Sequence, residues 1–208
     1  MNKEDLKQQL DHALVLQDIS LEDDAQDRLI DYLELLVRWN KTYNLTAIRD
    51  PEEMISRHLI DSLTILPFLN GKRFIDVGTG AGLPGMVAAI AAPDTNWVLL
   101  DSNQKKTRFL TQVVIELGLK NVDVVHARIE AFNDGRRFDM ATSRAVTSLL
   151  ALKEQVKHLC PNLLAMKGKI PDDELKELPE SCEVVIHQVR VAHDTAERSI
   201  IMIKDKNQ

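Results

Sequence analysis

Apolar runs of strand length alternate with stretches of helical spacing from Arg73 to about Gly168. RFIDV (73–77) and NWVLLD (96–101) are two such runs, and the stretches between successive runs are long enough to form helices. Strands separated by helices pair in parallel through right-handed crossovers. The pattern therefore predicts a doubly wound α/β fold with a mostly parallel sheet.

The end of the chain departs from this alternation. EVVIHQVRV (183–191) and RSIIMIKD (198–205) are both strand-like, and only AHDTAE separates them. Six residues are too few for a crossover helix, so these strands are expected to pair antiparallel. We expect them to form a hairpin at the edge of the sheet.

The first 70 residues show helical spacing and precede the sheet. Leu6, Leu10 and Leu14 share one helical face, and Ser20 is placed to cap a second helix that runs to Trp39. Pro51 suits the first turn of a third helix. We expect residues 1–70 to form a helical extension packed on the core, and residues 71–208 to form the ligand-binding domain.

Composition is that of an ordinary soluble protein with one substantial core. The chain has 208 residues, of which 44% are hydrophobic and 28% charged. It contains no apolar run near the roughly 18 residues of a membrane span, and its start lacks the apolar block of a secretory signal. Cys160 and Cys182 are expected to be buried thiols, which indicates the cytoplasm.

The net charge of −6 does not exclude a nucleic-acid partner. Residues 1–35 hold ten Asp and Glu against three Lys and Arg, so the acidity belongs to the first helices. The rest of the chain is close to neutral and can form basic patches.

A glycine-rich segment, FIDVGTGAGLPG (74–85), joins the first predicted strand to the next helix. Gly80, Gly82 and Gly85 satisfy the pattern G-x-G-x-x-G in the strand-to-helix context that gives this pattern meaning. Asp101 ends the second strand, where a carboxylate can accept hydrogen bonds from both ribose hydroxyls. NAD and S-adenosylmethionine both fit these features, and a tight turn without a ligand is the plain alternative.

Asp76 favours the second ligand. A carboxylate beside the loop would repel the pyrophosphate of a dinucleotide, whereas it would attract the ammonium and sulfonium groups of S-adenosylmethionine. A helix-dipole or capping role for Asp76 is the structural alternative.

The segments IDVGTGAG and LLDS resemble the first two motifs of class I S-adenosylmethionine-dependent methyltransferases, whose sheet is Rossmann-like. A longer series of segments runs from RWNKTYNLTAIRDPEEMISRHLIDSL through LLDSNQKKTRFL, RIEAF and SRAV to LLAMKG. In this order the series resembles the bacterial small-subunit ribosomal RNA guanine-N7 methyltransferases, the glucose-inhibited division protein B family. The resemblance covers about Leu36 to Gly168, and Ala81 stands where many relatives have proline.

This resemblance implies transfer of a methyl group from S-adenosylmethionine to N7 of a guanine in the decoding region of 16S rRNA. Its implied partner is 16S rRNA within the small ribosomal subunit or an assembly intermediate. The residues expected to bind the cofactor, from motif position and resemblance together, are Asp76, Gly78, Gly80, Gly82, Leu83, Asp101, Ile129, Glu130 and Arg144. We further expect a cytoplasmic monomer with no membrane partner.

The chemistry of N7 transfer agrees with what the sequence lacks. FDMATSRAV contains no [N/D]-P-P-[Y/F] element for exocyclic amines, and neither cysteine is placed for carbon methylation of a pyrimidine. Guanine N7 has a lone pair and no proton, so in-line attack on the methyl group requires no general base. An arginine that bonded N7 would block that lone pair, so guanine must be recognised at O6 or its Watson–Crick edge.

No catalytic residue is certain, and five residues are candidates for positioning the substrate. They are Asn44, His58, Asp61, Arg144 and Lys167. We expect the first three to form a wall or lid over the methyl-donor pocket, although a lone buried histidine more often has a purely structural role. Lys167 is placed to hold an RNA phosphate or the guanine.

Other basic and aromatic residues are interpreted against their structural alternatives. Lys105, Lys106 and Arg108 begin a helix beside the cofactor and can contact the RNA backbone, with a solvated face as the alternative. Trp39 and Tyr43 are expected to pack in the core rather than stack on a base.

Two other classes of function stay open. A nicotinamide oxidoreductase fits the glycine loop, and a noncatalytic scaffold could retain a cofactor fold. No group of Cys, His and carboxylates has metal-like spacing, so no metal is expected.

Overall fold

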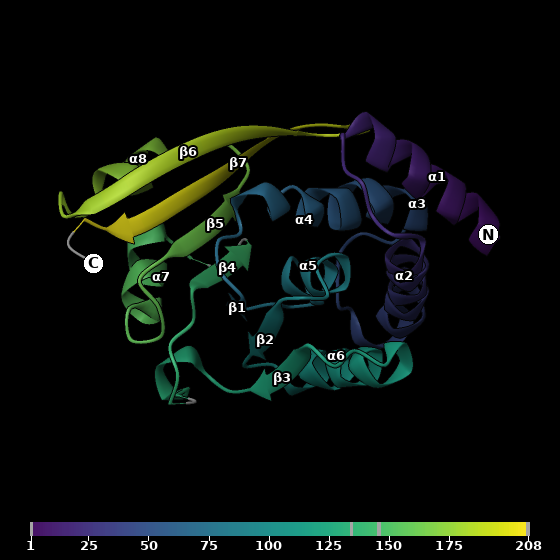
Figure 1. Ribbon diagram of the computed structural model, residues 1–208, viewed down its shortest axis with the longest axis horizontal. Helices are drawn as coiled ribbons and strands as arrows, with labels where there is room; N and C mark the ends of the chain where they lie inside the picture. The colour runs from purple at the N-terminus through teal and green to yellow at the C-terminus, as the bar shows by residue number, and fades with distance from the viewer. Residues whose placement is uncertain (1, 134, 145–146, 207–208) are drawn as a thin grey trace.

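The computed structural model describes residues 2–133, 135–144 and 147–206, which form one seven-stranded sheet with strand order β3-β2-β1-β4-β5-β7-β6 (Figure 1). Strands β1 to β5 are parallel, and β7 pairs antiparallel with both β5 and β6. The strands are β1 (Arg73–Val77), β2 (Asn96–Asp101), β3 (Val122–His126), β4 (Met140–Arg144), β5 (Leu163–Lys167), β6 (Cys182–Val191) and β7 (Asp194–Asp205). This confirms the predicted fold class.

Helices cover both faces of the sheet. The N-terminal block contains α1 (Lys3–Leu16), α2 (Asp23–Tyr43), α3 (Pro51–Met54), the π-helix η1 (Ile55–Ile60), α4 (Asp61–Leu63) and η2 (Leu66–Phe68). The later helices are α5 (Gly85–Ala91), α6 (Gln104–Leu117), η3 (Ile129–Ala131), α7 (Leu149–Val156) and α8 (Asp172–Lys176). None of the helices in this described part of the chain combines the length and hydrophobicity needed to cross a bilayer.

Two hydrophobic cores lie on opposite faces of the sheet, because successive strand residues point to opposite sides. Phe74 and Leu99 pack in one core with α1, α2, α5 and α6. Ile75 and Leu100 pack in the other with α7. The first core continues without a break from the N-terminal helices into the sheet, so it crosses the predicted boundary at residue 70.

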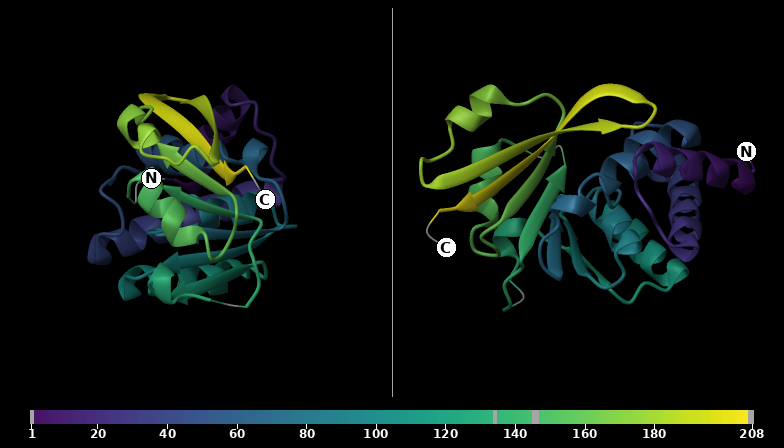
Figure 2. Two further views of the ribbon diagram at one scale, coloured as in Figure 1. Left: turned by 90° about the vertical axis from the view of Figure 1, so that its left-hand side faces the viewer. Right: turned by 45° about the horizontal axis from the view of Figure 1, so that its top comes forward.

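The turn of the β6–β7 hairpin meets the end of α1. The β6–β7 hairpin extends beyond the other strands toward α1 (Figure 2). There Gln17 donates to the carbonyl of Arg190 and accepts from the backbone N–H of Ala192. The hairpin is thereby attached to the N-terminal helices as well as to β5.

Three local predictions differ from the structure. Ser20 does not cap the second helix; α2 begins at Asp23, and its N-cap, Glu22, makes no side-chain cap bond. The third helix begins at Pro51 as expected but changes to a π-helix at Ile55, which a pattern of apolar spacing does not reveal. Strand β7 begins at Asp194 rather than near residue 198, because the antiparallel pairing continues across a bulge to a two-residue turn.

Gly85, at the start of α5, lets this helix pack closely on the sheet. A Cβ atom at this position would lie 2.5 Å from Leu99 Cδ2 and 2.6 Å from Asp76 Cβ. Both neighbours are fully buried. Glycine is required here by the available space.

We predict that Gly85→Ala destabilises the protein by about 1–3 kcal/mol, the usual cost of overpacking a core. Leu99→Ala should cost about 2–5 kcal/mol. The double variant should cost clearly less than the sum, because the new methyl group occupies space that Leu99 vacates. Urea unfolding measures all three.

Gly118→Ala provides the control, because no atom lies within 4 Å of a Cβ placed there. Its effect should add to that of Leu99→Ala. Strict additivity of Gly85→Ala with Leu99→Ala would contradict the steric explanation.

Candidate functional site

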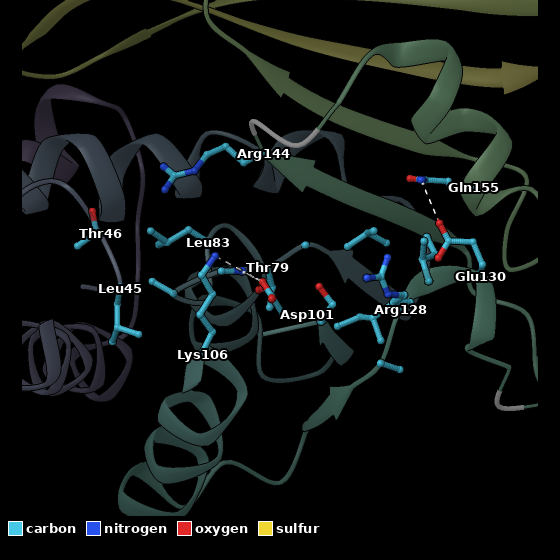
Figure 3. Close-up of a pocket in the computed structure, with 18 residues that line it drawn as sticks. Leu45, Thr46, Thr79, Leu83, Asp101, Lys106, Arg128, Glu130, Arg144 and Gln155 are labelled. Carbon is cyan, nitrogen blue, oxygen red and sulfur yellow. Dashed lines mark hydrogen bonds and ion pairs between the residues drawn. The ribbon is translucent and has the colours of Figure 1, made fainter. Parts of the chain in front are cut away.

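A cavity of about 480 Å³ opens at the carboxyl ends of the parallel strands (Figure 3). This volume is typical of small-molecule sites, and this edge is where open α/β sheets bind ligands. The loops after β1, β2 and β3 contribute most of its wall, and Arg144 at the end of β4 closes one side. It is lined by Leu45, Thr46, Val77, Gly78, Thr79, Gly80, Ala81, Leu83, Leu100, Asp101, Ser102, Lys106, Ala127, Arg128, Ile129, Glu130, Arg144 and Gln155.

The backbone N–H groups of the glycine loop are largely used within the protein. Apart from Ala81 and Pro84, every residue from Gly78 to Met86 donates its N–H to a protein oxygen. Examples are the bonds from Thr79 to Leu100 O and from Leu83 to Thr79 O. A pyrophosphate at a helix N-terminus needs such groups to be free. The loop is therefore poorly equipped to hold a dinucleotide.

Asp101 is held firmly at the floor of the cavity. Its Oδ2 accepts from the backbone N–H of Gly80 at 2.9 Å, and its Oδ1 accepts from Asn103 at 2.8 Å. Lys106 Nζ lies 3.8 Å from Oδ2. Each carboxylate oxygen has a second lone pair, so a diol of a bound ribose can donate to both.

Asp76 does not contact the cavity, and the expectation that it faces the ligand is wrong. The residue is fully buried, and its oxygens accept from the Thr79 hydroxyl at 2.6 Å, the Gly85 N–H at 2.9 Å and the Thr142 hydroxyl at 3.0 Å. Burial raises the pKa of Asp76 to about 6, against the lowering effect of these bonds. Asp76 fixes the loop, and its charge is no argument for a cationic ligand.

The wall opposite the sheet comes from the N-terminal block. Leu45 and Thr46 line the cavity just after α2 ends. The buried side chain of Asn40 fixes this loop by accepting from Thr46 N at 3.0 Å and donating to Ile48 O at 3.2 Å. Asn44 adopts the left-handed conformation that ends the helix.

His58 supports Thr46 from behind. Its Nδ1 lies 3.0 Å from Arg57 O, so Nδ1 carries the hydrogen and Nε2 accepts from the Thr46 hydroxyl at 2.8 Å. Burial, followed by the charge of Arg144, lowers the pKa of His58 to about 4. The ring is therefore neutral at pH 7 and acts as a fixed support.

Arg144 is joined to a buried carboxylate from the N-terminal block. Its Nη1 donates to Asp61 Oδ2 at 2.9 Å and to Arg57 O at 3.1 Å. The other oxygen of Asp61 accepts from Arg198 Nε at 2.8 Å. Asp61 is only 3% exposed, so one carboxylate links the cavity to β7.

The structure brings some of the predicted site residues together and separates others. The predicted residues that line the cavity are Gly78, Gly80, Leu83, Asp101, Ile129, Glu130 and Arg144. Those outside its lining are Asn44, His58, Asp61, Asp76, Gly82 and Lys167.

Separate contacts explain the positions of three of these excluded residues. A Cβ at Gly82 would lie 2.8 Å from both Leu110 and Met86, so this glycine serves packing. Lys167 is engaged by Glu174 at 2.9 Å and by Thr147 O, which opposes the predicted role in holding RNA. Asn44 is exposed and accepts from Arg49.

Several residues of the site were not predicted. Arg128 and Gln155 line the cavity, and Arg198 completes the ion pairs of Asp61. Arg128 directly precedes the Ile129–Glu130 pair, so its neighbours gave a local signal. Arg198 lies 137 residues from Asp61 along the chain, and no spacing rule connects them.

The cysteines and aromatic residues mostly follow their predictions. Cys160 and Cys182 are buried, and burial raises the pKa of the Cys160 thiol to about 11, so it is a poor nucleophile. Trp39 packs on Phe109, with ring centroids 5.7 Å apart, whereas Tyr43 is 43% exposed and touches Trp39. Across the described ranges, no cluster of side chains is arranged to hold a metal ion.

Comparison with known proteins matches residues 25–201 to the family described as rRNA small subunit methyltransferase G. The ribosomal RNA small subunit methyltransferase G of Stutzerimonas stutzeri is 48% identical over 192 residues, which cover 89% of each chain. That of Nitrosococcus oceani is 45% identical and covers 95% of this chain and 94% of its own.

Solved structures share the fold at low sequence identity. M. capricolum TrmK in complex with S-adenosyl-homocysteine aligns with a TM-score of 0.57 and 16% identity. The alignment covers 70% of this chain and 67% of that protein. At this low identity, the similarity shows a shared arrangement of helices and strands.

We predict a specific pH dependence of stability from His58. A depressed pKa in the folded state contributes stability above the unfolded value of 6.5, and this stability is lost as the pH falls toward 4. His58→Gln should therefore reduce the loss of unfolding free energy between pH 7 and 4.5 by about 2 kcal/mol, at 1.36 kcal/mol per pKa unit. Urea titrations at the two pH values measure it.

Asp76 acts in the opposite direction in the same range, because its raised pKa gives stability that disappears as the pH rises through about 6. Its contribution is present in both proteins and cancels in the difference. His12 is exposed, and its replacement by glutamine is the control for the loss of a histidine side chain. An equal change in both variants would contradict the assignment to His58.

Proposed function

The chain belongs to the rRNA small subunit methyltransferase G family, and on this premise we propose that it transfers a methyl group from S-adenosylmethionine to N7 of a guanine in 16S rRNA. The observation that carries the proposal is the cavity at the carboxyl edge of the sheet, with Asp101 at its floor and a glycine loop whose amides are already bonded. This site suits a nucleoside without phosphates.

The methyl donor is proposed to lie across the loops after β1, β2 and β3. Asp101 binds the two ribose hydroxyls, and Ile129 and Glu130 flank the adenine after β3. Gly78 and Gly80 allow the donor to approach the backbone, and Arg144 binds at the reacting end. The nicotinamide alternative is disfavoured by the bonded amides of the glycine loop, which leave little to hold a pyrophosphate.

The transfer step requires alignment rather than proton removal. The bond from the sulfonium sulfur to the methyl carbon breaks as the N7 lone pair forms the new bond, and the positive charge passes to the purine. Because N7 carries no proton, a site without a free base suffices; Glu130 already accepts from Gln155. Holding nitrogen, carbon and sulfur in line contributes up to roughly 7–11 kcal/mol in favourable cases.

The RNA is proposed to reach the cavity across basic side chains at its rim. Lys105, Arg108 and Arg128 are exposed there or on the first turns of α6, and they can contact phosphates. The target guanine leaves its stack to enter the cavity. We place the enzyme in the cytoplasm, acting as a monomer on the small subunit or an assembly intermediate.

We predict that the protein transfers labelled methyl groups from S-adenosylmethionine to small ribosomal subunits from a strain that lacks the gene. Mapping of the product should find N7-methylguanosine in 16S rRNA, absent without the enzyme. Naked 16S rRNA assayed in parallel distinguishes the two acceptors. An unchanged methylation profile in the gene deletion would overturn the proposed substrate.

Asp101→Asn should weaken binding of S-adenosylhomocysteine by about tenfold or more, because hydrogen bonds to a charged group contribute about 1.5–3 kcal/mol each. Calorimetry measures the affinity. Asp123→Asn is the matched control, since Asp123 is an exposed carboxylate on β3 outside the cavity lining. NADH should give no binding heat with either variant or the wild type.

A further inference from the structure

Asp61 occupies an unusual position for a carboxylate outside the sheet. It begins α4, directly after the π-helix η1, and is buried to 3% exposure. Arg144 Nη1 donates to Oδ2, and Arg198 Nε donates to Oδ1. One side chain of the N-terminal block thus holds arginines from β4 and β7.

The bonds that Arg144 makes to Asp61 and Arg57 determine which of its N–H groups stay available to a ligand. An isolated arginine and aspartate tend to pair through two parallel bonds, which would occupy two guanidinium nitrogens. Here Arg198 donates to Oδ1, and Arg144 binds Asp61 through a single bond from Nη1 to Oδ2. The same Nη1 also donates to Arg57 O, and both of its hydrogens are thereby used.

Three N–H groups of Arg144 remain, on Nε and Nη2. Within the described residues, these groups have no hydrogen-bond partner in the protein, and the side chain lines the cavity (Figure 3). They suit an anionic or carbonyl oxygen of a ligand. A carboxylate accepts two of them at once in the geometry that a guanidinium provides.

Arg198 has a second carboxylate partner besides Asp61. Asp194 Oδ2 accepts from Arg198 Nη2 at 2.8 Å and lies 3.8 Å from Arg57 Nε. Arg198 therefore remains paired on two sides and is 17% exposed. It can hold Asp61 in place without depending on Arg144.

We propose that Asp61 is a positioning residue that orients Arg144 toward the amino-acid carboxylate of the methyl donor. Asp61 touches neither ligand nor reacting atoms; it acts through Arg144. Arg198 contributes by holding the other oxygen of Asp61 in place. This inference rests on the proposed function, because it takes the cavity to be the site of S-adenosylmethionine.

The test measures S-adenosylhomocysteine binding by calorimetry in wild type, Asp61→Asn, Arg144→Gln and the double variant. Asp61→Asn should bind about tenfold more weakly, because an amide cannot accept charge-assisted bonds from two arginines. In the double variant the affinity should equal that of Arg144→Gln alone. Additive losses would overturn the proposal, because Asp61 would then act independently of Arg144.

Asp205→Asn is the control for general loss of an ion pair. Asp205 accepts from the buried Lys153 at 2.9 Å, and neither residue lines the cavity. Its affinity should stay within about threefold of wild type, since distant sites act independently. Weakening equal to that of Asp61→Asn would attribute the effect to stability and overturn the proposal.

If Asp61→Asn does not fold, Asp61→Glu replaces it in the binding test. It keeps the charge but moves the carboxylate by one methylene, so binding should weaken and unchanged affinity would overturn the proposal. Failure of the wild type to bind S-adenosylhomocysteine would refute the proposed function itself. Normal binding by the wild type together with normal binding by Asp61→Asn would refute only the positioning role.

Discussion

The buried carboxylate of Asp76 is the interaction on which the rest of the site depends. It joins the end of β1 to the glycine loop through Thr79, to the start of α5 through Gly85 and to β4 through Thr142. The absence of a side chain at Gly85 lets the helix approach closely enough for the second bond. These contacts fix the position of the loop relative to the sheet. The loop in turn holds Asp101, because the backbone N–H of Gly80 donates to its carboxylate. This network shapes the cavity.

The N-terminal helices belong to the same network. The fully buried Tyr32 of α2 donates to Ala81 O at 2.8 Å and supports the glycine loop from the side opposite the sheet. Its burial raises the pKa of the Tyr32 hydroxyl, so this donor keeps its hydrogen. Thr46 closes the cavity with the help of His58, and Asp61 reaches the end of β4. The block that precedes the sheet therefore contributes one wall of the pocket, through Leu45 and Thr46, and supports the rest.

The sequence predicted the sheet well because strands and crossover helices leave strong local patterns. RFIDV and NWVLLD are mostly apolar because β1 and β2 are buried along almost their whole length, and the C-terminal segments are close enough in the chain to pair as a hairpin. The place of Asp101 at the cavity was predictable for the same reason, since this residue ends a strand. Asp76 was misjudged because spacing does not tell which direction a side chain faces. Arg198 was missed because its contact with Asp61 joins segments far apart in the chain. The π-helix was missed because apolar spacing does not distinguish it from an α-helix.

The strand order has a consequence for how the enzyme is made. Strand β7 follows all other elements in the chain, yet it lies between β5 and β6 in the sheet. During synthesis β6 emerges first and has no neighbour until β7 inserts. Asp61 likewise lacks its second arginine until then. A nascent chain that already displays every glycine and acidic motif therefore still lacks the pairing of β6 and the second arginine of Asp61.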